Sequence, residues 1–114
     1  MTGVFMETIQ DDGKLRLPDY FLEENVRGKV ICWQDLYNDD VLCFTFKGQD
    51  ELESLIDELI EGDIFELEIN DGFLILNEFA LALIKEKDVA IVGCFSYAEI
   101  YGAKRWNEIA SFEN

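Results

Sequence analysis

The chain has 114 residues, enough for one domain or for two small units that share a core. Hydrophobic residues make up 49% of the chain, which excludes wholesale disorder, and no apolar stretch reaches the roughly 18 residues needed to span a bilayer. The net charge of −16 favours solubility and sets the overall field against nucleic acid.

The first half predicts strands, a turn and short helices. Four segments have the alternation, or the β-branched and aromatic content, of strands: 4–9, 14–17, 29–33 and 41–46. Asp11-Asp12-Gly13 supplies turn chemistry, Pro18 ends the second strand, and residues 19–24 can form a helical turn. Residues 50–61 carry the apolar stripe of an amphipathic helix, with an acidic outer face that we expect to be solvated.

The second half predicts the same order of elements. The expected strands are 64–69, 73–76, 88–94 and 97–101. A turn is expected at Asn70-Asp71-Gly72. Asn77 can cap a helix over 78–87, and a closing helix is expected at 103–112.

The two halves also match residue by residue, at an offset of 59 positions. The matching pairs are Gly13 and Gly72, Leu15 and Leu74, Leu17 and Leu76, Leu22 and Leu81, and Val30 and Val89. Each half has too few strands to bury its apolar face alone. We therefore expect two repeats, 1–62 and 63–114, that share one core as interleaved hairpins in a barrel-like sheet related by a pseudo-twofold axis.

Three segments carry a resemblance to a known family. The segment 88–108 (DVAIVGCFSYAEIYGAKRWNE) looks like the signature of MraZ proteins. The stretch 13–18 (GKLRLP) resembles the Gly-Arg-x-x-x-Pro stretch of that family, and 30–32 (VIC), with Asp35 and Tyr37 beyond it, lies where MraZ proteins have similar residues. The resemblance covers nearly the whole chain, although the connecting middle is shorter than usual. It implies a β-rich α+β fold, a tandem-repeat swapped-hairpin barrel of the SpoVT/AbrB type with short helices.

The resemblance also implies a function. MraZ proteins are cytoplasmic, nucleoid-associated transcriptional regulators of the division and cell-wall gene cluster. They form rings that hold several DNA-contacting loops against repeated promoter boxes. The implied partners are therefore double-stranded DNA and other copies of the chain, with no membrane. The implied DNA-binding residues are Gly13, Lys14 and Arg16, the last two being the only close basic pair on a predicted hairpin.

The chain departs from the family's Asp-x-x-x-Arg motif in both repeats. Anchoring on Pro18 puts Gln10 at the Asp position and Lys14 at the Arg position, whereas a shift of two residues gives a literal match from Asp12 to Arg16. The second repeat has Ile69 and Phe73 at the two positions. An alternative therefore stays open: an acidic interaction module that kept the barrel, lost DNA, and binds a protein partner or co-assembles with another MraZ protein.

Catalytic, cofactor and metal motifs do not stand out. The chain has no His, no Cys-x-x-Cys and no Gly-rich phosphate loop, so an enzyme is not favoured and no cofactor or metal ligand is predicted. Acidic pairs such as Asp39/Asp40 are typical turn formers. Cys32, Cys43 and Cys94 are expected as buried reduced thiols. The aromatic residues expected in the core are Trp33, Phe44, Phe46, Phe79, Phe95 and Trp106. The start of the chain lacks a signal-peptide pattern, which favours the cytoplasm.

Overall fold

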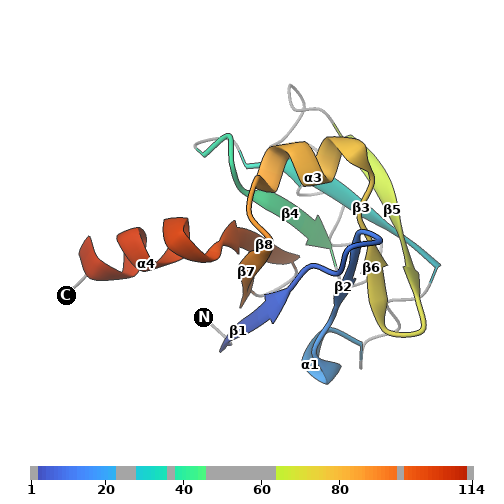
Figure 1. The fold of residues 1–114 in the computed structure, drawn as a ribbon. Coiled ribbons are helices and arrows are strands. Elements are labelled where there is room, and N and C mark those ends of the chain that lie inside the picture. Colours follow the sequence, from blue (N-terminus) through green and yellow to red (C-terminus); the bar gives the residue numbers. More distant parts are fainter. Residues whose placement is uncertain (1–2, 23–27, 36–37, 46–63, 95–96, 113–114) are drawn as a thin grey trace.

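The computed structural model describes residues 3–22, 28–35, 38–45, 64–94 and 97–112 (Figure 1). The elements in chain order are β1 (Gly3–Thr8), β2 (Lys14–Arg16), α1 (Asp19–Leu22), β3 (Gly28–Gln34), β4 (Leu42–Thr45), β5 (Ile64–Asn70), β6 (Phe73–Ile75), α3 (Glu78–Ile84), β7 (Asp88–Gly93), β8 (Tyr97–Gly102) and α4 (Ala103–Phe112). The helix expected at 50–61 lies outside the described residues.

The strands form one antiparallel sheet that curls into a nearly closed barrel. Its eight strands lie in the order β1-β7-β8-β4-β3-β5-β6-β2. The two edge strands, β1 and β2, follow each other in the chain and are joined by a single turn, so the edges of the sheet come together. This arrangement removes most of the unpaired strand edge that an open sheet would expose. The prediction of a strand-rich barrel with short helices is confirmed.

Most strand pairs join the first half of the chain to the second. Four of the seven pairs do so: β1 with β7, β2 with β6, β3 with β5, and β4 with β8. The remaining pairs, β3 with β4, β5 with β6 and β7 with β8, are hairpins within one half. Neither half could keep its sheet neighbours without the other.

The two matching glycines, Gly13 and Gly72, lie in similar backbone environments. Their φ angles are +85° and +83°, in the left-handed region that glycine adopts without steric cost. The amide of Leu17 donates to the Gly72 carbonyl at 2.9 Å, and the amide of Leu76 donates to the Gly13 carbonyl at 3.0 Å. Each glycine therefore ties its own hairpin to the strand that follows the other glycine.

The two hairpin turns differ by one residue. The β5–β6 turn consists of Asp71 and Gly72 alone, both with positive φ, as the type I′ turn of a two-residue hairpin requires. The β1–β2 turn has three residues: the Gly13 amide donates to the Gln10 carbonyl at 2.9 Å, and the Gln10 amide donates to the Lys14 carbonyl at 2.9 Å. The loop that carries the predicted DNA-binding residues is therefore the longer of the two.

Apolar side chains form two layers, one inside the barrel and one on its outer surface. The inner layer draws on both halves and includes Leu15, Leu74, Phe21, Phe44 and Ile91. The outer layer comprises Trp33, Val41, Cys43, Val92 and Tyr101. The helix α4 packs Trp106 and Ile109 against this outer layer, and its far end leads away from the barrel (Figure 1).

The core prediction is correct for some aromatic residues and wrong for one. Trp33 and Phe44 are buried, and Trp106 is half-buried. Phe79, in the first turn of α3, is 46% exposed, because the buried face of this helix carries Ala80, Leu83 and Ile84 instead; its ring packs edge-to-face against Phe65 of β5. The other two, Phe46 and Phe95, lie outside the described residues.

The helix α3 begins where the sequence predicts and ends earlier. The Asn77 side chain accepts a hydrogen bond from the Ala80 amide at 2.9 Å, as an N-cap should. The helix ends at Ile84 because Lys85 adopts a left-handed conformation with φ of +66°, and its amide donates to the Leu81 carbonyl. The predicted end at residue 87 was therefore too late.

Candidate nucleic-acid interface

The strand β2 directs Lys14 and Arg16 away from the barrel. Successive side chains of a strand point to opposite faces, and Leu15 between them is fully buried in the inner layer. Lys14 pairs with Ile75 and Arg16 with Phe73 in the β2–β6 register, and both basic side chains are exposed. The structure therefore brings the predicted pair to one outer surface, directly after the turn at Gly13.

Asp12 hydrogen-bonds within the loop and partly neutralises the positive charge of Lys14. One oxygen of its carboxylate accepts from the Lys14 amide at 3.2 Å, and the other lies 3.7 Å from the Lys14 Nζ. An exposed ion pair of this kind contributes about 0–1 kcal/mol. A phosphate group can therefore replace Asp12 as the partner of Lys14 at small cost. Arg16 makes no ion pair with any described residue.

A third cation lies on the same outer face of the sheet. The strand register places Lys14, Ile75, Glu68 and Lys29 in one row across β2, β6, β5 and β3. Three strand spacings separate Lys14 from Lys29, roughly 14 Å. Sequence spacing could not have found Lys29, because only the pairing of β3 with β5 brings it to this face. Glu68 stands between the two lysines and weakens their combined field.

A shallow groove lies beside the β1–β2 loop. Its volume is about 230 Å³, and its lining includes Asp11, Gly13, Lys85 and Lys87. The Nζ of Lys87 lies 2.8 Å from an Asp11 carboxylate oxygen. The hydrogen bond and the charge of Lys87 lower the pKa of Asp11, and Asp11 in turn raises the pKa of Lys87. This pair ties the base of the loop to the segment between α3 and β7.

Replacing Lys87 by Gln is expected to raise the pKa of Asp11 toward its ordinary value of 3.8. Because the folded pKa is depressed, the pair stabilises the fold above the unfolded pKa and loses this contribution as the pH falls through the folded pKa. A carboxyl-carbon NMR titration of both proteins would measure the change. Lys85→Gln, at the other lysine of the groove, is the control and should leave the pKa of Asp11 unchanged; an unshifted Asp11 in Lys87→Gln would contradict the assignment.

The second hairpin offers no matching basic pair. Its outward positions on β6 are Phe73 and Ile75, both half-buried, and its turn carries Asp71. The basic pair at 104–105 does not join the site either: the Arg105 side chain binds Asp40 at 3.3 Å and the Asn38 side chain at 3.1 Å. Among the described residues, the first loop and β2 therefore carry the basic pair on which the candidate interface depends.

None of the helices in the described part of the chain combines the length and the apolar character needed to cross a membrane. Two of the three predicted thiols, Cys32 and Cys43, are buried, whereas Cys94 is only half-buried. No protein-family model matches the chain, and no curated protein matches it.

Proposed function

We propose that the chain is a MraZ-like tandem repeat whose halves, 1–62 and 63–114, form a swapped-hairpin barrel with pseudo-twofold symmetry. The strand pairs support this proposal. Exchanging the halves turns the β1–β7 pair into the β5–β3 pair, and it leaves the β2–β6 and β4–β8 pairs unchanged. The β2–β6 register is centred on Leu15 and Leu74, which are also matching positions in the repeat. The reciprocal hydrogen bonds at Gly13 and Gly72 agree with the same axis.

On this fold, the proposed function is DNA-binding transcriptional regulation by a multivalent oligomer. The observation that carries it is the outward pair of Lys14 and Arg16, exposed directly after the glycine turn and held in register by β6. Lys and Arg contacts to phosphate supply much of the affinity of proteins for DNA. Two cations in one subunit give weak binding, and several subunits on repeated boxes can raise it by a few orders of magnitude.

The test is the binding of the protein to its own upstream DNA at several salt concentrations. Lys14→Gln combined with Arg16→Gln should weaken binding about tenfold or more and flatten the salt dependence, because each lost phosphate contact lowers the slope by about one. Lys104→Gln combined with Arg105→Gln removes the same charge from α4, away from the candidate site, and is the matched control. Equal losses in both double variants, or no binding by the unmodified protein at low salt, would exclude the proposal.

The second candidate is an acidic interaction module with the same barrel. It is favoured by the pairing of Lys14 with Asp12 and of Lys87 with Asp11, which leaves little free positive charge around the first loop. The net charge of −16 points the same way, since it attracts a basic partner over long distances. Failure of the DNA experiment together with salt-dependent binding to a basic protein partner would favour this candidate.

A further inference from the structure

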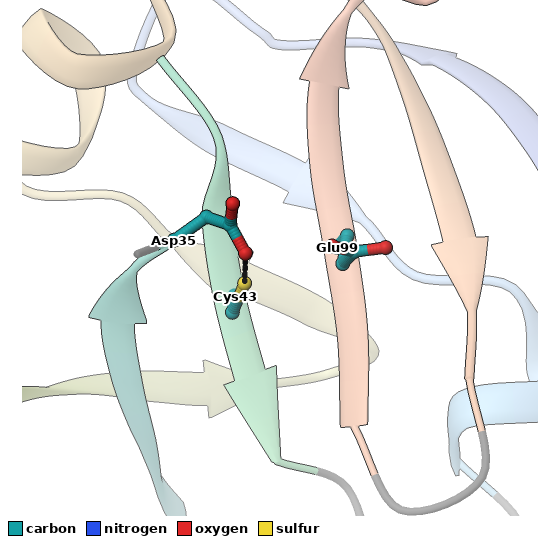
Figure 2. Close-up of side chains that lie close together, drawn as sticks. All are labelled: Asp35, Cys43 and Glu99. Carbon is teal, nitrogen blue, oxygen red and sulfur yellow. Dashed lines mark hydrogen bonds between the residues drawn. The ribbon is translucent and has the colours of Figure 1, made fainter. Parts of the chain in front are cut away.

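Two carboxylates and a thiol from three strand segments gather on the outer surface of the barrel. Asp35 follows β3, Cys43 lies in β4, and Glu99 lies directly opposite Cys43 in β8 (Figure 2). Their ligand atoms all lie within 4.8 Å of one another, and the Cys43 Sγ is 4.0 Å from an Asp35 carboxylate oxygen. A second thiol adjoins them, because the Cys94 Sγ is 3.6 Å from the Glu99 carboxylate.

The two thiols and the two acids occupy corresponding positions in the two β-hairpins. The amide of Asp35 closes the β3–β4 hairpin by donating to Val41, and the amide of Cys94 closes the β7–β8 hairpin by donating to Tyr97. In the first hairpin the acid precedes the turn and the thiol follows it. In the second hairpin the thiol precedes the turn and Glu99 follows it. Asp35, Cys43 and Glu99 therefore meet where β4 lies beside β8, and Cys94 adjoins them at Glu99.

Three of these four groups, Asp35, Glu99 and Cys94, are oriented by a neighbour outside the cluster. One oxygen of Asp35 accepts from the amide and the side chain of Asn38, at 3.1 and 3.2 Å, while its other oxygen faces Cys43. Tyr101 forms a side-chain hydrogen bond with Glu99, and Tyr97 forms one with Cys94. Ligands held by hydrogen bonds from such an outer shell are a regular property of metal sites in proteins.

The donor set and its dimensions suit a particular class of ion. Thiolate together with carboxylate favours zinc over calcium or magnesium, which bind oxygen alone. With Zn–S near 2.3 Å and Zn–O near 2.0 Å, a tetrahedral site separates its S and O ligands by roughly 3.5 Å. The separations of 3.6 Å between Cys94 and Glu99 and of 4.0 Å between Cys43 and Asp35 are within about half an ångström of this value. The widest separation among Asp35, Cys43 and Glu99 is at most 4.8 Å, so these side chains must close in by roughly 1.3 Å or less.

We propose that Asp35, Cys43 and Glu99, joined by Cys94, form a binding site for a zinc-class divalent ion that links the β3–β4 and β7–β8 hairpins. The ion replaces the thiol protons of Cys43 and Cys94, and both protons leave to solvent. Cys43 is fully buried, so the ion enters past the half-exposed carboxylates of Asp35 and Glu99. The carboxylates of Asp35 and Glu99 lie close together on a half-buried surface, where they repel each other. A cation placed between them removes this repulsion and stabilises both charged forms. This site is independent of the proposed DNA interface.

Titration of the metal-free, reduced protein with Co²⁺ tests the proposal. Thiolate ligation should produce charge-transfer absorption in the near ultraviolet and tetrahedral bands in the visible, and stoichiometric Zn²⁺ should abolish both. Cys43→Ser should clearly weaken the charge-transfer band, and the part that remains should come from Cys94. Glu99→Gln keeps both thiols and should weaken Zn²⁺ binding about tenfold or more in competition with a chromophoric chelator. Circular dichroism of each variant would establish that it remains folded.

Cys32→Ser is the matched control. Cys32 is also a fully buried thiol, but it belongs to the inner layer, on the opposite face of the sheet from Cys43. This variant should retain the full cobalt spectrum. The absence of a charge-transfer band in the unmodified protein, a band that survives Cys43→Ser unchanged, or a folded Glu99→Gln protein with unaltered zinc affinity would each overturn the site.

Discussion

Phe21→Ala is expected to lower the free energy of unfolding by about 3–5 kcal/mol, the usual cost of truncating a buried phenylalanine. Phe21 is fully buried, and its ring makes edge-to-face contacts with Phe5 at 5.5 Å and Phe44 at 6.0 Å between ring centroids. It therefore anchors α1, which follows directly after the predicted DNA-binding strand, to β1 and β4. Because small domains have a net stability of about 5–15 kcal/mol, this single change removes a large share of it.

Urea unfolding followed by fluorescence and circular dichroism would measure the change. Phe79→Ala is the control, because Phe79 is half exposed and has Phe65 as its described ring partner. Phe79→Ala should lower the free energy of unfolding by much less than Phe21→Ala does. A loss of less than about 1 kcal/mol in Phe21→Ala would mean that the ring is not packed as described.

Neither half of the chain is expected to fold alone. Fragments 1–62 and 63–114 each lack the partners of most of their strands, because four of the seven strand pairs join the two halves. Each fragment would leave unpaired strand edges and one open face of the inner apolar layer in water. Separately, the fragments should show little amide dispersion in NMR spectra and no cooperative thermal transition.

An equimolar mixture of the two fragments should regain the dispersed spectrum and the cooperative transition of the intact protein, at least in part. A mixture that carries Leu15→Asn in the first fragment is the control, because this change buries an amide opposite Leu74 at the centre of the β2–β6 pair. The Leu15→Asn fragment should therefore fail to restore the dispersed spectrum and the cooperative transition. A cooperative transition in either isolated fragment would show that the halves are separate domains.

The sequence predicts those parts of the fold that depend on local pattern. Alternation and β-branched content place all eight strands, and the closing helix runs over 103–112 as expected. The end of α3 is missed because Lys85 adopts a left-handed conformation, for which glycine or asparagine is the usual signal. The exposure of Phe79 is missed because an aromatic residue in an apolar run looks like core until the neighbours of its helix face are known.

The sites depend on strand register, which the local pattern does not contain. Gly13, Lys14 and Arg16 could be found because they are close in the chain, whereas Lys29 reaches their face only through β5 and β6. The cluster of Asp35, Cys43 and Glu99 spans 64 positions of the chain and depends on the pairing of β4 with β8. The positions of the cysteines in the sequence predicted buried thiols with no further role. This description fits Cys32, but nothing in the sequence indicated that two acids lie beside Cys43.

The pairing of β1 with β7 has a consequence for synthesis of the protein. Gly3 lies opposite Gly93, so β1 finds its neighbour in the sheet only after the ribosome has added β7. Barrels that depend on such distant pairs fold slowly, because the entropy of closing a long loop is lost before the stabilising contacts form. Until then the apolar side of β1 is open to other nascent chains. The first half of the chain must therefore stay in solution until β7 has been made, and its many acidic side chains favour this.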